Sequence, residues 1–163
     1  MPQYFKLVSE FQTINRRTFP FVDETVADPN SARPAIHGEF FQLGSGSSKG
    51  KMARGGDDTV STPGTPDDEA TVPSYCYFAE QGRYDVQALK RGPFLYMHSY
   101  EADTQVMDGD GLAIGDALAV YDIDTLGTIV RRGLAKKASG YVIGYVTRLP
   151  ADNGGWLRFV RMG

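Results

Sequence analysis

The sequence predicts a mainly β protein: a small antiparallel β-barrel or sandwich with an extended N-terminal arm, long loops and little helix. The last third of the chain holds short runs rich in Val, Ile, Tyr and Thr, separated by Gly and charged residues, which is typical of β-strands. No helical period lies between these runs, and strands at such spacing close into small barrels or sandwiches. The 19 Gly and 9 Pro residues supply the turns that many short strands require.

The chain of 163 residues suits one domain with an appended segment. Beyond a candidate strand at 4–8, residues 1–33 carry scattered aromatic side chains without a period of 2 or 3.6, and prolines then stop regular structure. We therefore predict an extended arm at 1–33 and a single β-rich domain at 34–163. The aromatic side chains of the arm could pack on the chain's own barrel or on a partner's surface.

The first half of the predicted domain alternates strands with loops. Residues 34–43 indicate a strand with a kink at Gly38, and 51–54 can begin the returning strand. A long surface loop at about 55–73 is rich in Gly, Asp, Thr and Pro, and loops of this length are usually functional or mobile. Residues 74–79 then indicate a buried aromatic strand.

The second half holds most of the predicted strands. Residues 85–90 could make one helical turn, which is the best helix candidate in the chain, and Asp-Gly-Asp-Gly at 108–111 predicts a tight turn. The remaining predicted strands are 94–98, 102–107, 117–121, 128–130, 141–147 and 156–160.

Acidic and basic residues occupy separate blocks of the sequence. Residues 101–124 contain seven acids and no Lys or Arg, whereas 131–161 contain seven basic residues and one acid, Asp152. If the blocks form neighbouring antiparallel strands, opposite charges face each other across the ladder. The alternative is that the two signs lie on different edges, so that the acidic side of one molecule meets the basic side of another body.

The cysteine and histidine content restricts the chemistry. One cysteine, Cys76, excludes an internal disulfide, and its aromatic neighbours predict a buried structural thiol. His37 and His98 are too few for a zinc site with a single cysteine. There is no signal-peptide core and no run of about 18 apolar residues, so we expect a protein kept in soluble form and not inserted in a membrane.

Two motifs resemble ligand loops but depart from them. The run at 44–51 has five residues between its outer glycines where a phosphate-binding loop has four, and Met52 replaces the hydroxyl residue. Asp108 and Asp110 resemble the start of a calcium loop, but the later ligand positions are apolar. A net charge of −3 argues against nucleic-acid binding. We expect no catalytic, cofactor or metal site and no nucleic-acid partner.

Glycine and strand patterns in the C-terminal block carry a family resemblance. They are Gly115-Asp116 leading into 118–121, VRRGLAKK at 130–137, GYVIGYVT at 140–147 and GWLRFV at 155–160, together with Gly38-Glu39-Phe40 followed by Lys51 and Arg54. On these residues the chain resembles the head decoration, or capsid cement, proteins of tailed bacteriophages, over about 34–54 and 94–162.

The resemblance implies a structural virion protein without enzymatic activity. It would bind the outer surface of an assembled phage capsid and stabilise junctions between major capsid protein subunits. Proteins of this type often trimerise, so the resemblance also implies neighbouring copies, and potentially a homotrimer, as partners. The protein would be made in the host cytoplasm and located on the capsid exterior of the virion.

The predicted contact residues are aromatic and cationic. Phenylalanines of the arm would fill pockets of the partner, and arginines would pair with carboxylates, for which the guanidinium fork is well shaped. The candidates are Phe11, Arg16, Arg17, Phe19, Phe21, Arg131 and Arg132.

Two other functions stay open at this point. A carbohydrate- or receptor-binding β-sandwich of a virion would present exposed flat rings, with candidates Tyr75, Tyr77, Tyr96, Tyr100 and Trp156. An enzyme would need carboxylates that converge in a cleft with separated pKa values, with candidates Asp110, Asp116, Asp122 and Asp124.

Overall fold

The computed structural model describes residues 4–10, 16–22, 36–53, 69–78, 91–95, 99–123 and 131–162. These residues form β-strands and two short 3-10 helices, with no α-helix among them, so the mainly β prediction is confirmed. The elements are β1 Phe5–Glu10, β2 Arg16–Val22, β3 Phe40–Leu43, η1 Gly46–Ser48, β4 Met52–Ala53, β5 Ser74–Tyr77, β6 Arg91–Leu95, β7 Tyr100–Thr104, β8 Ala117–Ile123, β9 Arg131–Lys136, β10 Gly144–Arg148, η2 Pro150–Asp152 and β11 Leu157–Arg161. In the described part of the chain, no helix is long and apolar enough to cross a lipid bilayer.

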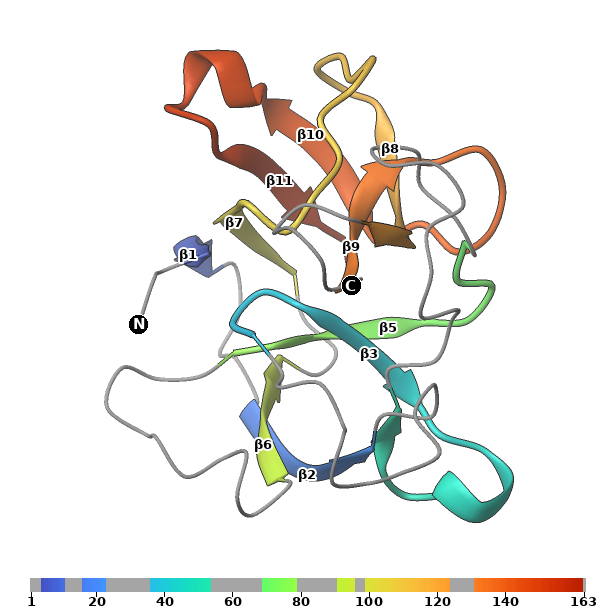
Figure 1. Cartoon of the computed structure of the whole chain (residues 1–163). Coiled ribbons are helices and arrows are strands. Elements are labelled where there is room, and N and C mark those ends of the chain that lie inside the picture. The colour runs from blue at the N-terminus through green and yellow to red at the C-terminus, as the bar shows by residue number, and fades with distance from the viewer. Residues whose placement is uncertain are drawn as a thin grey trace.

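Five strands close into a barrel in the order β2-β4-β3-β5-β6, which occupies the lower half of Figure 1. All neighbours in it are antiparallel except β2 and β4, which run parallel. Alternate residues of a strand point to the same side, so Tyr75 and Tyr77 of β5 both enter the barrel core. This core contains Phe41, Met52, Tyr75, Tyr77 and Phe94.

Six antiparallel strands form the second sheet, in the order β1-β7-β11-β10-β8-β9. The chain that leaves β7 runs along the far edge strand β9. There Leu134 donates its backbone N–H to the Val106 carbonyl at 3.0 Å, and Asp108 donates to the Leu134 carbonyl at 2.8 Å. A segment that begins near one edge of the sheet thus ends at the other edge, which requires the sheet to curl (Figure 1).

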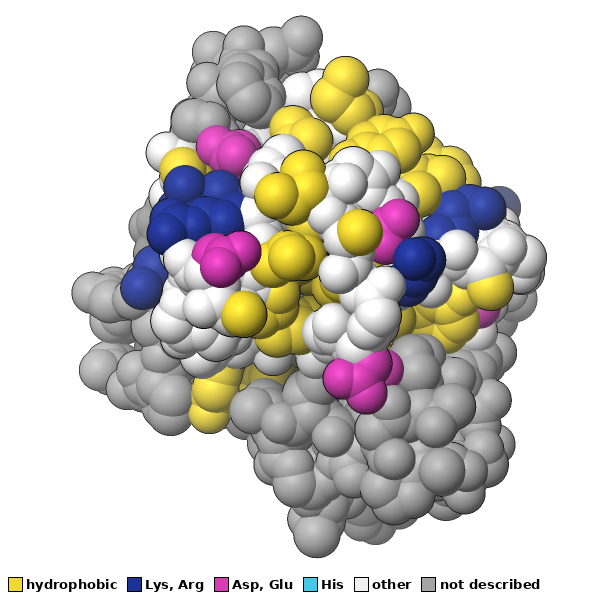
Figure 2. Space-filling model, turned by 90° about the horizontal axis from the view of Figure 1, so that it is seen from above, with side chains coloured by type: hydrophobic (Ala, Val, Ile, Leu, Met, Phe, Trp, Pro, Cys, Tyr) yellow, Lys and Arg dark blue, Asp and Glu magenta, His cyan; other side chains and the backbone are white. Residues whose placement is uncertain are grey.

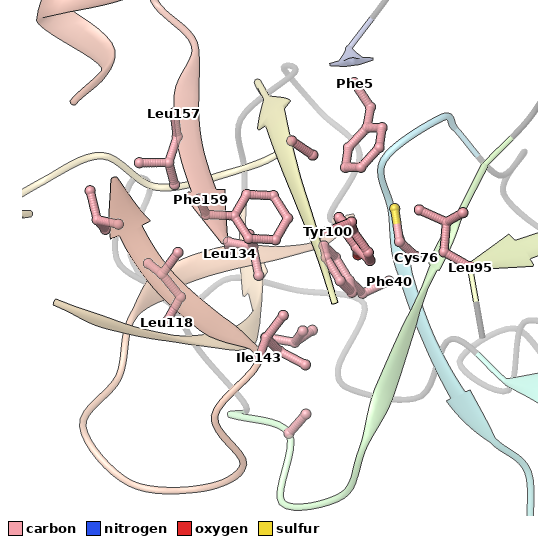
Figure 3. Close-up of a cluster of buried hydrophobic side chains, with 14 residues drawn as sticks. Phe5, Phe40, Cys76, Leu95, Tyr100, Leu118, Leu134, Ile143, Leu157 and Phe159 are labelled. Carbon is pink, nitrogen blue, oxygen red and sulfur yellow. The ribbon is translucent and has the colours of Figure 1, made fainter. Parts of the chain in front are cut away.

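One hydrophobic core joins the barrel and the six-stranded sheet. In Figure 3, Tyr100 of β7 lies between Phe159 of β11 and the barrel residues Phe40, Cys76 and Leu95. All five side chains are at most 1% exposed. Cys76 is therefore the buried thiol that the sequence predicted, and burial raises its pKa far above the ordinary value.

The described part of the predicted arm is built into the fold. β1 is an edge strand of the six-stranded sheet, and β2 is a strand of the barrel. Phe5 of β1 is fully buried, with its ring centroid 6.3 Å from that of Tyr100 and 6.4 Å from that of Phe159. The description of 1–33 as an extended arm is therefore corrected for residues 5–10 and 16–22, because these residues form strands that pair within the two sheets.

Other element boundaries differ from the predictions in detail. The predicted strand at 34–43 is a turn around Gly38 followed by β3, and the predicted 94–98 and 102–107 are observed earlier, as β6 and β7. The turn predicted at 108–111 is present at Asp110 and Gly111. The predicted strand at 128–130, the helical turn at 85–90 and most of the 55–73 loop lie outside the described residues.

Candidate interaction surface

The predicted contact arginines of β9 lie inside the protein. Arg131 and Arg132 are 6% and 3% exposed. The Arg131 Nη1 atom lies 3.3 Å from Glu39 Oε2, and Arg132 Nη1 lies 2.9 Å from Asp122 Oδ1. Removing one partner of such a buried pair typically costs about 3–5 kcal/mol, because the other charge stays in the interior. We therefore correct the predicted role: these arginines hold β9 to β8 and to the segment before β3, and they are not exposed to a partner.

The predicted contact residues of the arm are placed only in part. Phe19 of β2 packs on Phe94 in the barrel, with ring centroids 6.3 Å apart. Arg16 and Arg17 contribute backbone to the β2–β6 ladder and Phe21 to the β2–β4 ladder, but their side chains are outside the described structure, as is all of Phe11. Of the two alternatives for the arm's aromatic residues, Phe19 follows the one in which they pack on the chain's own barrel.

The acidic and basic blocks face each other across the six-stranded sheet, as the ladder hypothesis predicted. Asp122 and Arg132 are register partners on β8 and β9. Asp103 and Arg158 are register partners on β7 and β11, joined by hydrogen bonds of 2.7 and 3.0 Å to the two carboxylate oxygens. The Arg158 hydrogen bond holds the pKa of Asp103 below its ordinary value. Most charges of these blocks therefore stabilise the fold itself.

Two loops meet at one end of the six-stranded sheet, and we call their combined surface the end face. It consists of residues 107–116, between β7 and β8, and 149–155, between β10 and β11. A methyl group placed on Gly109 would lie 3.4 Å from both Met107 Sδ and Pro150 Cγ, so the two loops are in contact. Figure 2 looks down on this end, and hydrophobic side chains gather across it between Lys and Arg side chains on either side.

Ile114 lies at the tip of the first loop of the end face. It is 67% exposed, the highest value among the large hydrophobic side chains of the described residues. Met107, Leu112 and Leu149 from the two loops are only partly buried against the main core. Exposed apolar groups that form a continuous surface mark contacts with other molecules. The end face is therefore the best candidate interaction surface.

Hydrogen bonds and one ion pair hold the loop around Ile114. Ala113 donates its N–H to Asp116 Oδ2 at 2.8 Å, and Gly115 donates to the Val146 carbonyl at 2.8 Å. Lys136 Nζ lies 2.8 Å from Asp116 Oδ2 and donates to the Gly111 carbonyl at 3.3 Å. The hydrogen bond from Lys136 lowers the pKa of Asp116. The exposed isoleucine is thus presented by a loop whose shape is already fixed, which reduces the entropy lost on binding.

Besides Asp152 of the second loop, two carboxylates of the end face have no ion-pair partner among the described residues. Asp110 donates its backbone N–H to Asp108 Oδ1 at 2.9 Å, which closes the turn. Neither carboxylate forms an ion pair with Lys or Arg among the residues that the structure describes. The end face therefore combines an apolar centre with two carboxylates that remain available to a cationic group.

The rings proposed for carbohydrate binding are mostly inaccessible. Tyr75, Tyr77 and Tyr100 are 8%, 3% and 0% exposed. Trp156 is partly exposed, but Lys6 Nζ lies 4.2 Å from its ring centroid. Tyr96 is outside the described residues. The most exposed tyrosines of the described structure are instead Tyr141 and Tyr145, at 42% and 41%.

The carboxylates proposed for catalysis serve other roles where they are described. Asp116 pairs with Lys136, and Asp122 is buried beside Arg132. Asp110 is exposed in the turn of the end face, and Asp124 is outside the described part. Within the described ranges, no group of three His, Cys, Asp or Glu side chains is placed to hold a metal ion.

The sequence contained one signal of the end face that pattern analysis missed. Turn residues are usually small or polar, but here Ile114 stands directly before Gly115 in the loop that follows the Asp-Gly-Asp-Gly turn. An isoleucine at a turn tip belongs neither to a strand nor to the core, so it is a candidate contact residue. In comparisons with known proteins, no family model, no curated protein and no solved structure matches this chain.

Proposed function

We propose that this protein is a structural virion protein that binds the outer surface of an assembled phage capsid and stabilises junctions between major capsid protein subunits. The end face is the observation that carries the proposal. It presents an exposed isoleucine on a hydrogen-bonded loop, above a sheet in which Asp122 pairs with Arg132 and Asp103 with Arg158. The resemblance to head decoration proteins supports the capsid as the partner.

A small apolar surface is sufficient for attachment to a repeating lattice. Burying one isoleucine side chain contributes about 1.5–3 kcal/mol, which alone gives weak binding. A copy that bridges two subunits, or contacts neighbouring copies, gains from effective concentration without any stronger single contact.

The test is to mix the purified protein with expanded, undecorated shells of the matching phage. We expect the protein to co-sediment with the shells and to raise their melting temperature in calorimetry. Shells that melt at an unchanged temperature and sediment without the protein would contradict the proposed function.

A carbohydrate- or receptor-binding module of a virion is the second candidate. Its support is now limited to the exposed rings of Tyr141 and Tyr145, since the described rings first proposed for it are buried or covered. Stacking on a sugar would be lost in the Tyr141→Ala/Tyr145→Ala variant. Glycan binding that this variant abolishes, combined with no shell binding, would favour the second candidate.

A further inference from the structure

We infer that the end face recognises a capsid surface on which an apolar side chain is flanked by Lys or Arg. The inference rests on the proposed function and specifies the chemistry of the partner. We draw it from a comparison of the described acidic residues that have a partner within the chain with those for which none is observed.

Four of the seven acids of the block that begins at Glu101 are engaged by other strands. Glu101 accepts a hydrogen bond from the Thr147 hydroxyl at 3.0 Å. Asp103, Asp116 and Asp122 pair with Arg158, Lys136 and Arg132. Asp108 and Asp110 are the exceptions among the described residues, and both belong to the end face.

These two carboxylates favour a cation supplied by the partner. They lie in one turn, where the Asp110 N–H is bonded to Asp108 Oδ1, so both acidic residues belong to the same short stretch of the loop. An ammonium or guanidinium group near this turn would be attracted to both carboxylates and would steer the approach of the partner.

The apolar part of the surface sets the second requirement. Ile114 is 67% exposed in the same loop as the two carboxylates, and Met107 and Leu112 lie partly buried beside the core. An apolar partner side chain over Ile114 would remove this surface from water, and a neighbouring basic side chain would reach the carboxylates. A partner surface on which apolar and basic residues alternate meets both requirements.

The same charges disfavour two other occupants. In a two-fold contact centred on the Asp108–Asp110 turn, the carboxylates of one copy would meet those of the other, so self-association centred there is opposed. Nucleic acid would bring phosphates toward Asp108 and Asp110, which is also repulsive.

The experiment measures shell binding of matched variants at low and high salt. Ile114→Ser should weaken binding about tenfold or more, as expected for a central apolar contact. Leu43→Ser is the control, because Leu43 is 45% exposed but belongs to β3 of the barrel, and its binding should stay within about twofold of the original.

The carboxylates are tested by a pair of double variants. Asp108→Asn/Asp110→Asn removes the charge but keeps an oxygen that can accept the hydrogen bond from the N–H of residue 110. The association rate should therefore fall several-fold, and binding should lose most of its dependence on salt. Asp108→Glu/Asp110→Glu keeps the charge and should keep the salt dependence. Melting of each variant by circular dichroism verifies that it is folded.

A crosslink identifies the partner surface directly. A photoreactive phenylalanine analogue at position 114 should crosslink to a capsid protein peptide that contains Lys or Arg beside apolar residues. A crosslink to another copy of the chain, or to a capsid segment without basic residues, would overturn the inference. Wild-type affinity and wild-type salt dependence in both the Ile114→Ser and the double Asn variant would also overturn the inference, although the proposed function would then stand. Failure of the unmodified protein to bind shells would instead remove the proposed function, and the inference with it.

Discussion

At the scale of single residues, His37 shows how burial determines ionisation. Its ring packs against Phe5 and Phe78, with centroid distances of 5.4 and 4.8 Å. Burial lowers the pKa of His37 to about 4, and its Nε2 atom has no hydrogen-bond partner in the described structure. The neutral ring therefore acts as a core side chain at pH 7.

This pKa predicts a loss of stability in mild acid. Between about pH 6.5 and about pH 4 the unfolded chain binds a proton at His37 that the folded chain excludes, so the free energy of unfolding falls as the pH is lowered through this window. We expect a loss of roughly 2 kcal/mol, allowing for partial exposure of the ring. Urea unfolding of the original protein and His37→Phe at both ends of the window measures it. A slope that is identical in the two proteins would contradict this origin.

Gly38 allows a close approach between two distant segments. Its φ is +94°, and a Cβ at this position would lie 2.9 Å from the Cβ of Phe5. We expect Gly38→Ala to destabilise the protein by about 2–4 kcal/mol, because strain and overpacking combine. Gly50→Ala is the control: its φ of +82° is similar, but nothing lies within 4 Å, so about 1 kcal/mol is expected. Thermal unfolding compares them, and equal losses would show that packing on Phe5 is irrelevant.

At the scale of elements, β9 depends on two buried ion pairs on opposite faces of the strand. Arg132→Met should leave Asp122 charged in the interior and cost about 3–5 kcal/mol. The double variant Arg132→Met/Asp122→Leu should recover much of this loss, since no buried charge then remains. A double-mutant cycle by chemical denaturation gives the coupling energy. Additive effects of the two substitutions would contradict the pairing.

The sequence predicted those strands whose pattern is uninterrupted. The runs at 117–121 and 156–160 correspond closely to β8 and β11, because alternation and glycine boundaries are local properties. β1 was only a candidate at 4–8, and the observed strand continues beyond it through a register shift between Leu7 and Ser9. The burial of Arg131 was not predictable, because its partner Glu39 is 92 residues away. The end face was missed for the same reason: it arises where two distant loops meet.

At the scale of the whole molecule, the shared core makes the two sheets interdependent. Phe40 and Leu95 of the barrel lie in the same cluster as Leu118 and Phe159 of the six-stranded sheet. We expect a single unfolding transition in which Trp156 fluorescence and far-ultraviolet circular dichroism coincide. Phe40→Ala should shift both probes together by about 3–5 kcal/mol. Two separate transitions would mean that barrel and sheet fold independently.

The buried thiol has a practical consequence for the study of assemblies. Cys76 is fully enclosed between the two sheets, and its raised pKa leaves almost no thiolate near neutral pH. Alkylating dyes should therefore not modify the native chain, and a cysteine introduced on the outside would be the single labelled position. A fluorophore attached there would report the orientation of each copy on its target without any change to the interior.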